Sequence, residues 1–167
     1  MLIIFEGADN SGKTTIAIEL GHVLNYKYFK HTDQQKDITS KYRHKQIIEA
    51  KFFLDLMSQT KFNIIVDRHI LSEYVYSKVY DRHLHLDLIF KIDQQLASLN
   101  TILIYCEKRF DENYSDNIIP QIHLPKIIAA YREYLKITKM KYLFLDTTDE
   151  NLTKQILTII TFLKEVS

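Results

Sequence analysis

The stretch Gly7–Thr14 contains residue types at a spacing suited to binding a polyphosphate. It runs Gly-Ala-Asp-Asn-Ser-Gly-Lys-Thr and fits the Walker A pattern G-x-x-x-x-G-K-[S/T] without a gap. Glycines let the backbone turn so that successive N–H groups point at a phosphate, and a following helix N-terminus adds partial positive charge. We therefore expect Lys13 to reach the β- and γ-phosphates of a nucleoside triphosphate, and the Thr14 hydroxyl to bind Mg²⁺. The other residues of this loop expected to contact ATP are Gly7, Asn10, Ser11, Gly12 and Thr15.

A second group of polar side chains follows the apolar run Asn63–Val66. Asp67 and Arg68 come first, and Ser72 and Tyr76 follow at intervals of four from Arg68. Phosphoryl transfer depends on positioning and on neutralising negative charge more than on covalent help. Arg68 can bridge donor and acceptor phosphates with its forked guanidinium, while Asp67 can orient Arg68 and a magnesium-bound water. An ion pair that only fixes the end of a strand is the structural alternative for these two residues.

Alternating strands and helices must position these motifs. Short, continuous apolar runs are typical of parallel strands covered on both faces, and longer helical patterns separate them. We expect strands at Leu2–Phe5, Tyr26–Lys30, Asn63–Val66, Thr101–Cys106 and Tyr142–Leu145. We expect helices at Lys13–Leu24, Tyr42–Gln59, Leu71–Tyr80, Leu84–Leu99, Leu124–Lys139 and Asp149–Val166. The alternation predicts one α/β domain over residues 1–167, with three layers, a parallel five-stranded sheet and ligands at the carboxyl ends of the strands.

Two helix starts have local signals. Pro125 can occupy the first turn of its helix, where its missing N–H is not needed. Thr147, with Glu150 three residues later, predicts a capping box.

Composition limits the classes of protein to consider. The 167 residues are 46% hydrophobic and 26% charged, which is ordinary for one globular domain. A net charge of +1 gives no overall field that would attract nucleic acid or an anionic membrane. The single cysteine, Cys106, excludes a disulfide framework and is expected to be buried. No run approaches the ~18 apolar residues of a membrane span, and Leu2–Phe5 is too short for the core of a signal peptide, so we expect a cytoplasmic protein without a membrane partner.

Together the two motifs resemble the thymidylate kinase-like branch of the P-loop nucleotide kinases. That family contains Asp-Arg-Tyr/His, a Ser three residues on and a Tyr nine residues after the Asp, as this chain does from Asp67 to Tyr76. Phe5–Thr15 resembles the family's phosphate loop, and Leu145–Thr148 resembles its late strand and the loop near the adenine. The resemblance extends over nearly the whole chain, with shorter intervals than usual. It implies a P-loop kinase fold, with ATP and Mg²⁺ as the phosphate donor and a nucleotide as the acceptor.

The resemblance also implies an acceptor site. Asp9 matches a carboxylate near the acceptor sugar, and Tyr76 matches a ring that lies beneath the sugar and disfavours a ribose 2′-hydroxyl. The alternatives are loop solvation for Asp9 and core packing for Tyr76. The family pattern Phe-x-x-Asp-Arg becomes Phe52-Phe53-Leu54-Asp55-Leu56, so Phe52 is expected to stack on the base. Leu56 replaces the Arg that contacts thymine in the family, which favours a base other than thymine, or a pocket that recognises the base through other residues. Plain core packing is the alternative for Phe52 as well.

The segment after Thr101–Cys106 matches a short lid, at about residues 107–120. Lys108 and Arg109 are its candidates to meet the transferring phosphoryl group, and a solvated charged turn is the alternative. Residues 26–51 are locally basic, and one or two of these cations are expected to meet the acceptor phosphate. They are Lys27, Lys30, Lys36, Lys41, Arg43 and Lys45.

The resulting interpretation is a deoxynucleoside monophosphate kinase. The catalytic residues are expected to be Asp9, Lys13, Asp67 and Arg68; the acceptor-binding residues Asp9, Phe52, Arg68, Ser72 and Tyr76; the metal ligands Thr14 and Asp67; and Arg109 is expected to contact ATP.

Three alternative functions stay open. One is a deoxynucleoside kinase, whose Glu-Arg-Ser motif differs from Asp67-Arg68-His69. The second is a kinase of a nucleic-acid end or a modified base, and the third is a nucleotide-binding module without turnover. A GTPase is disfavoured because no Asn-Lys-x-Asp motif is present. Small nucleotides are therefore the expected partners, and the resemblance leaves a homodimer open because related kinases are often dimers.

Overall fold

The computed structural model describes residues 1–30, 40–60, 63–83, 85–110 and 123–166, including their side chains except those of 40–47 and 49. Its centre is a parallel five-stranded sheet in the order β2-β3-β1-β4-β5. The strands are β1 (Leu2–Glu6), β2 (Lys27–Lys30), β3 (Ile64–Asp67), β4 (Ile102–Glu107) and β5 (Lys141–Asp146). The helices are α1 (Lys13–Leu24), α2 (Ser40–Gln59), α3 (Ile70–Val79), α4 (Leu86–Ser98), α5 (Leu124–Leu135) and α6 (Leu152–Val166). The predicted fold class is confirmed.

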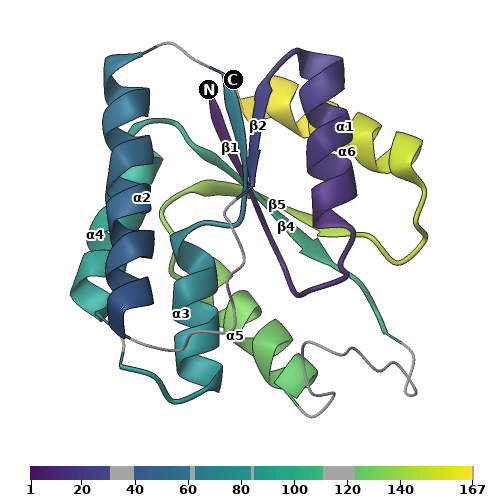
Figure 1. Cartoon of the computed structure of the whole chain (residues 1–167). Coiled ribbons are helices and arrows are strands. Elements are labelled where there is room, and N and C mark those ends of the chain that lie inside the picture. Colours follow the sequence, from purple (N-terminus) through teal and green to yellow (C-terminus); the bar gives the residue numbers. More distant parts are fainter. Residues whose placement is uncertain (31–39, 61–62, 84, 111–122, 167) are drawn as a thin grey trace.

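Helices cover both faces of the sheet, with α1 and α6 on one face and α2 to α5 on the other (Figure 1). Each central strand therefore contributes to two cores. In β1, Leu2 and Ile4 face α2 to α5, whereas Ile3 and Phe5 face α1 and α6. This double burial is why the strands are continuously apolar in sequence rather than alternating.

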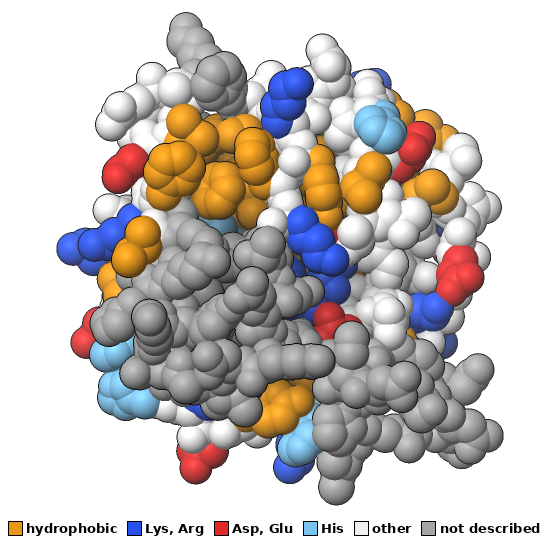
Figure 2. Space-filling view, in the orientation of Figure 1, with side chains coloured by type: hydrophobic (Ala, Val, Ile, Leu, Met, Phe, Trp, Pro, Cys, Tyr) orange, Lys and Arg blue, Asp and Glu red, His pale blue; other side chains and the backbone are white. Residues whose placement is uncertain are grey.

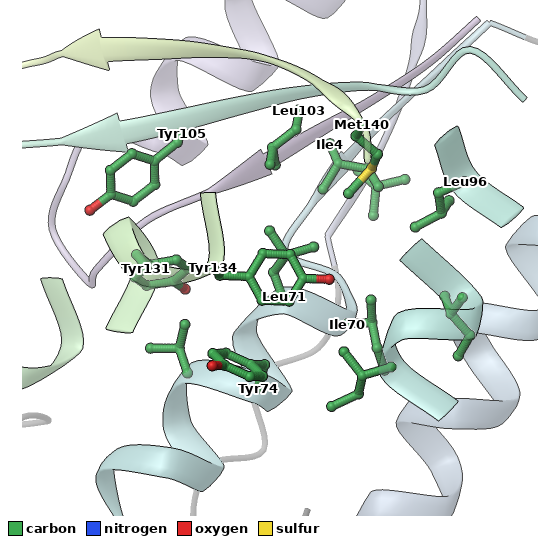
Figure 3. Packing of buried hydrophobic residues seen from close by; sticks show 14 of the residues in the cluster. Ile4, Ile70, Leu71, Tyr74, Leu96, Leu103, Tyr105, Tyr131, Tyr134 and Met140 are labelled. Carbon is green, nitrogen blue, oxygen red and sulfur yellow. The ribbon is translucent and has the colours of Figure 1, made fainter. Parts of the chain in front are cut away.

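The larger core lies under α3, α4 and α5 and is rich in tyrosine (Figure 3). The rings of Tyr74 and Tyr134 pack edge to face with their centroids 5.0 Å apart. Burial of a tyrosine requires a partner for its hydroxyl. Tyr134 meets this requirement by donating to the buried carboxylate of Asp93 at 3.0 Å.

Asp93 also explains why α5 ends at Leu135 rather than at the predicted Lys139. Its carboxylate accepts hydrogen bonds from the Thr138 hydroxyl at 2.5 Å and from the Lys139 N–H at 2.8 Å. These bonds hold the chain in a turn directly after the helix. The predicted helical pattern continues through this turn, but a long-range polar contact ends the helix earlier.

The predicted capping box at Thr147 and Glu150 is wrong. The Thr147 hydroxyl donates instead to the Ser11 carbonyl oxygen, 2.8 Å away in the phosphate loop. The helix α6 begins at Leu152, and Asn151 caps it by accepting the Lys154 N–H at 3.0 Å. Other predicted boundaries lie within two residues of those observed.

The carboxyl ends of the strands meet at one edge of the sheet. Phe5 of β1 lies in register with Asp67 of β3, and Glu6 of β1 with Tyr105 of β4. The phosphate loop leaves β1 here, directly beside Asp67 and Arg68. Cys106 is buried in β4 as predicted, and burial raises the pKa of its thiol to about 12. Among the helices that the structure describes, none is both long and apolar enough to span a membrane.

Candidate active site

The phosphate loop is wound tightly against the end of β4. Gly7 has a φ of +150°, and a Cβ atom at this position would lie 2.2 Å from the Cys106 carbonyl oxygen. Gly12, at φ +76°, is the left-handed residue from which α1 starts. Only glycine fits both requirements without strain. The Thr147 hydroxyl fixes the loop from the β5 side through its bond to Ser11, so the loop is held at both flanks.

Lys13 lies at the inner side of this loop and is 5% exposed. Its ammonium group donates to the Ala8 carbonyl oxygen at 3.0 Å and lies 3.9 Å from a carboxylate oxygen of Asp9. Burial, and then the nearby positive charge of Arg68, lower the pKa of Lys13. The cation is therefore desolvated before any ligand binds, which strengthens its interaction with a phosphate.

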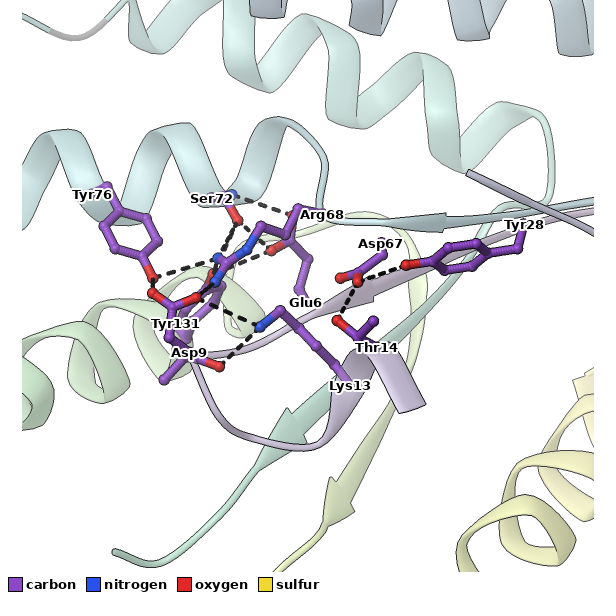
Figure 4. Close-up of polar contacts among 11 residues, drawn as sticks. Glu6, Asp9, Lys13, Thr14, Tyr28, Asp67, Arg68, Ser72, Tyr76 and Tyr131 are labelled. Atoms are coloured by element: carbon purple, nitrogen blue, oxygen red, sulfur yellow. Dashed lines mark hydrogen bonds and ion pairs between the residues drawn. The ribbon is translucent and has the colours of Figure 1, made fainter. Parts of the chain in front are cut away.

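Thr14 and Asp67 form a pair suited to Mg²⁺. The Thr14 hydroxyl donates to Asp67 Oδ2 at 2.5 Å, and the Tyr28 hydroxyl donates to the same oxygen at 3.1 Å (Figure 4). The second oxygen, Asp67 Oδ1, is buried and has no hydrogen-bond partner among the described residues. A hydroxyl and a carboxylate are hard oxygen ligands, so the donor set fits the metal expected here.

Arg68 is the centre of the site. Its backbone is left-handed, with a φ of +70°, and its N–H donates to the Phe5 carbonyl oxygen at 2.9 Å. The guanidinium Nη2 bonds to a carboxylate oxygen of Asp9. Nη1 lies 3.2 Å from Ser72 Oγ and 3.4 Å from the Tyr76 hydroxyl, and the guanidinium carbon lies 5.4 Å from the centroid of the Tyr76 ring. The structure therefore brings together Asp9, Lys13, Asp67, Arg68, Ser72 and Tyr76, as Figure 4 shows.

Glu6 supports Arg68 through the hydroxyl groups of Ser72 and Tyr131. Its fully buried carboxylate accepts bonds from the His69 N–H at 2.7 Å, the Ser72 hydroxyl at 2.6 Å and the Tyr131 hydroxyl at 3.1 Å. Burial raises the pKa of Glu6, and the Arg68 charge opposes this shift. Ser72 thus connects Glu6 to Arg68, which makes it a supporting residue as well as a candidate for contact with the acceptor.

Known proteins share this arrangement of elements. No protein-family model matches the chain. The chain is 24% identical to the cytidylate kinase of Saccharolobus islandicus over 181 residues, which cover 100% of this chain and 93% of that protein. A crystal structure of the YorR protein of Bacillus subtilis with phosphorylated GDP has a TM-score of 0.74 at 23% identity, covering 99% of this chain and 96% of that one.

Two further solved structures belong to named kinases. The deoxyadenosine kinase of M. mycoides with bound dATP has a TM-score of 0.68 at 22% identity, covering 98% of this chain and 100% of that one. The thymidylate kinase of Candida albicans has a TM-score of 0.62 at 19% identity, covering 99% of this chain and 93% of that one. The chain has the fold of the P-loop nucleoside and nucleotide kinases. The resemblance drawn from the two sequence motifs is confirmed at this level.

The side of α2 that faces the site carries aromatic side chains. Phe53 is half-buried, and its ring centroid lies 5.8 Å from that of Phe29 and 6.4 Å from that of His69. Phe52, the residue expected to stack on a base, is 61% exposed and lies 6.0 Å from Phe53. Phe29 and Phe52 are both exposed, and each ring contacts Phe53. Figure 2 shows hydrophobic side chains gathered on this part of the surface. The structure thus adds Phe53 to Phe52 as a candidate to meet the base.

The lid region is described only in its first residues. Lys108 forms an ion pair with Glu150, and the exposed Arg109 guanidinium lies 3.4 Å from Asp146 Oδ2. The Arg109 N–H also donates to the Thr148 hydroxyl at 3.0 Å. Both cations are therefore held by the end of β5 and the loop that follows it, rather than by the group around Lys13 and Arg68. The rest of the predicted lid lies outside the described residues, as does Lys36, and the same holds for the side chains of Lys41, Arg43 and Lys45.

Asn10 and Thr15 are both exposed and lie on either side of the loop's second glycine. Asn10 has a left-handed φ of +58°, which asparagine adopts more readily than most residues.

Sequence reasoning missed three residues that support Asp67 and Arg68: Glu6, Tyr28 and Tyr131. Glu6 had a usable signal, because an ionisable residue between a buried strand and a phosphate loop must have buried partners. Tyr28 and Tyr131 had none, since they are two of eleven tyrosines and lie 39 and 63 residues from the site residues that they contact.

Proposed function

We propose that this protein is a deoxynucleoside monophosphate kinase that transfers the γ-phosphoryl group of ATP to the phosphate of a deoxynucleotide. The observation that supports it most is the buried guanidinium of Arg68, held between the phosphate loop and α3. Arg68 is 5% exposed and is aligned by Asp9, Ser72 and Tyr76. A planar, permanently charged fork in this position matches two phosphate groups at once.

Each residue then has a defined task. The backbone of the phosphate loop and the Lys13 ammonium hold the triphosphate, and Lys13 and Arg68 neutralise the charge that grows on the transferring group. Thr14 and Asp67 would hold Mg²⁺, which supplies further neutralisation of the phosphate oxygens when bound. Asp67 Oδ2 receives a second hydrogen bond from Tyr28, so the carboxylate, including its other oxygen Oδ1, stays in a fixed position.

The acceptor sugar is proposed to lie on Tyr76, between Asp9 and α3. The Tyr76 hydroxyl donates to Asp9 Oδ2 at 3.2 Å, which fixes its ring against Arg68. Burial is the main reason why the pKa of Tyr76 is raised, so the hydroxyl stays protonated and remains a donor. A fixed ring beneath the sugar leaves little room for a 2′-hydroxyl, which supports a deoxyribose acceptor. The base would then reach Phe52 and Phe53.

A specific observation favours a monophosphate over a nucleoside as the acceptor. The 5′-hydroxyl of a nucleoside must lose a proton, so its transfer benefits from a carboxylate that is available as a general base. The two carboxylates nearest the proposed sugar are already engaged. Asp9 pairs with Arg68 and accepts a hydrogen bond from the Tyr76 hydroxyl, and both oxygens of the buried Glu6 accept bonds from the His69, Ser72 and Tyr131 groups. A phosphate acceptor needs no general base, and its negative charge can pair with the Arg68 guanidinium.

The proposal is tested by measuring ADP formation from ATP in the presence of nucleosides, nucleoside monophosphates and oligonucleotides in turn. Acceptor-dependent turnover with deoxynucleoside monophosphates, abolished in Lys13→Ala, is the expected result. Tight binding of nucleotides without turnover for any acceptor would instead identify a nucleotide-binding module. A steep fall in activity with salt, seen only with oligonucleotides, would identify a kinase of nucleic-acid ends.

A further inference from the structure

A second cluster of aromatic and cationic side chains continues outward from Tyr76 along α3. The rings of Tyr76 and Tyr80 are nearly parallel, at 8°, with their centroids 6.3 Å apart. The Arg82 guanidinium carbon lies 5.0 Å from the centroid of the Tyr80 ring. His123, at the start of α5, lies 5.0 Å from the same ring. Tyr80, Arg82 and His123 form what we call the outer cluster.

Arg82 differs from the other described arginines in its partners. Arg68, Arg109 and Arg132 each pair with a carboxylate, whereas Arg82 has no ion pair with any residue that the structure describes. Its Nε is buried and has no hydrogen-bond partner there, and the same is true of His123 Nδ1. The Arg82 side chain is held by the face of Tyr80, and its backbone N–H donates to the Ser77 carbonyl oxygen at 2.8 Å. A half-buried guanidinium that forms no ion pair with a described residue can bind an external anion through its terminal nitrogens.

The outer cluster lies close to the acceptor site. Burial raises the pKa of the Tyr80 hydroxyl; the Arg82 charge opposes this shift and the Asp9 carboxylate adds to it. Asp9 is therefore near enough for its charge to act on Tyr80. Stacking of Tyr80 on Tyr76 makes the two rings one continuous surface that starts at Arg68 and ends at Arg82.

The direction of this surface indicates which part of an acceptor would reach it. The helix α3 packs against α2 on one side and against α5 on the other (Figure 1). In the proposed function the base extends toward α2 and the 5′-phosphate toward Arg68. His123 lies on the α5 side of α3. A substituent of the sugar that reaches the outer cluster must therefore extend away from the base. On a deoxyribose, that position is the 3′-oxygen.

We infer that Tyr80, Arg82 and His123 form a subsite for a phosphate ester on the 3′-oxygen of the acceptor sugar. This inference rests on the proposed function, because that function places the sugar on Tyr76. Two acceptors contain such an ester: a deoxynucleoside 3′,5′-bisphosphate, and the 5′-phosphorylated end of a short oligonucleotide.

Calorimetric titration tests the inference with each of the common deoxynucleoside 5′-monophosphates, its 3′,5′-bisphosphate and the corresponding 5′-phosphorylated dinucleotide. The wild type should bind the bisphosphate at least tenfold more tightly than the monophosphate. Arg82→Gln should remove this advantage and leave the affinity for the monophosphate unchanged, while Arg82→Lys should keep part of it. Lys91→Gln is the matched control, because Lys91 is an exposed cation on α4 and its loss changes the net charge equally. The control should retain the full advantage.

The dinucleotide distinguishes the two sources of the ester. If it binds as tightly as the bisphosphate, the subsite accepts the next nucleotide of a strand; if it binds like the monophosphate, the subsite accepts a terminal phosphate only. Equal affinity of the wild type for monophosphate and bisphosphate would overturn the inference, as would equal losses in Arg82→Gln and Lys91→Gln. Turnover of monophosphates without a 3′-phosphate advantage would overturn the inference alone. A 3′-phosphate advantage without phosphoryl transfer to any acceptor would overturn the proposed function alone.

Discussion

Replacing Arg68 by lysine separates the charge of this residue from its geometry. Both side chains are unbranched at Cβ, so the left-handed backbone at φ +70° is equally strained in either case. The positive charge is also retained. The variant therefore removes one property, the planar fork with which Nη2 bonds to Asp9 while Nη1 faces Ser72 and Tyr76.

The contacts of Arg68 set the size of the expected loss. The three oxygens near Nη1 lie at 3.2, 3.4 and 3.5 Å, so these bonds are long and individually weak. The bond of Nη2 to the Asp9 carboxylate is charge-assisted, and lysine can keep it. Lysine has a single terminal nitrogen, so it cannot bond to Asp9 and also present a second, coplanar N–H donor to a phosphate. One charge-assisted bond is worth about 1.5–3 kcal/mol, so kcat/KM should fall by roughly 10- to 150-fold.

The assay is steady-state ADP formation with the best monophosphate acceptor, together with thermal unfolding of each variant. Arg132→Lys is the matched control, because Arg132 pairs with Glu107 at the end of β4, outside the group formed by Asp9, Lys13 and Arg68. It should change kcat/KM less than twofold, because lysine retains the positive charge and this pair does not contact the reacting groups. Activity of Arg68→Lys within threefold of the wild type would refute the bridging role. A loss of activity that accompanies a fall in Tm of ten degrees or more, roughly 2.5–5 kcal/mol for a domain of this size, would make Arg68 a structural residue.

Three further variants test other parts of the site. Lys13→Met should reduce turnover by about 100-fold or more and raise Tm by a few degrees, because it removes a buried cation whose charged form is disfavoured in the fold. Because the pKa of Lys13 is lower in the folded state, the folded wild type loses this proton at a lower pH than the unfolded chain does. The difference in stability between Lys13→Met and the wild type should therefore shrink as pH rises toward the ordinary pKa of 10.5. A difference that widens with pH would contradict the assignment. Thr147→Val should raise the KM for ATP several-fold and lower stability by about 1 kcal/mol, because Ser11 loses its hydrogen bond; an unchanged KM would show that the loop does not need this contact. Tyr76→Ala should narrow the difference in kcat/KM between deoxyribonucleotide and ribonucleotide acceptors, whereas unchanged discrimination would make Tyr76 a packing residue.

Most of the fold could be predicted from the sequence because its determinants are local. Continuous apolar runs such as Thr101–Cys106 are long enough to identify strands, and they occur because both faces of the sheet are covered. The misplaced ends have non-local causes. Asp93 ends α5 from 45 residues away through Thr138, and Thr147 uses its hydroxyl on Ser11, 136 residues away, instead of capping α6. A helical pattern contains no information about such contacts.

The candidate site divides in the same way. Gly7 to Thr14 and Asp67 to Tyr76 are continuous motifs, so their residues could be named in advance. The support of Arg68 by Glu6 and Tyr131 could not, because these two residues are 125 positions apart and meet only when α5 packs on α3. The left-handed backbone of Arg68 could not be predicted either, because nothing in the neighbouring sequence specifies a positive φ for an arginine.

The most direct measurement compares each deoxynucleoside monophosphate with its own nucleoside as acceptor of labelled phosphate from γ-labelled ATP. The base and the sugar are identical within each pair, so the ratio of the two kcat/KM values isolates the contribution of the acceptor phosphate. The proposed function predicts labelled deoxynucleoside diphosphates and a ratio of at least 100 in favour of the monophosphate, about 2.7 kcal/mol. A ratio at or below one, with label appearing in the monophosphate made from the nucleoside, would contradict it.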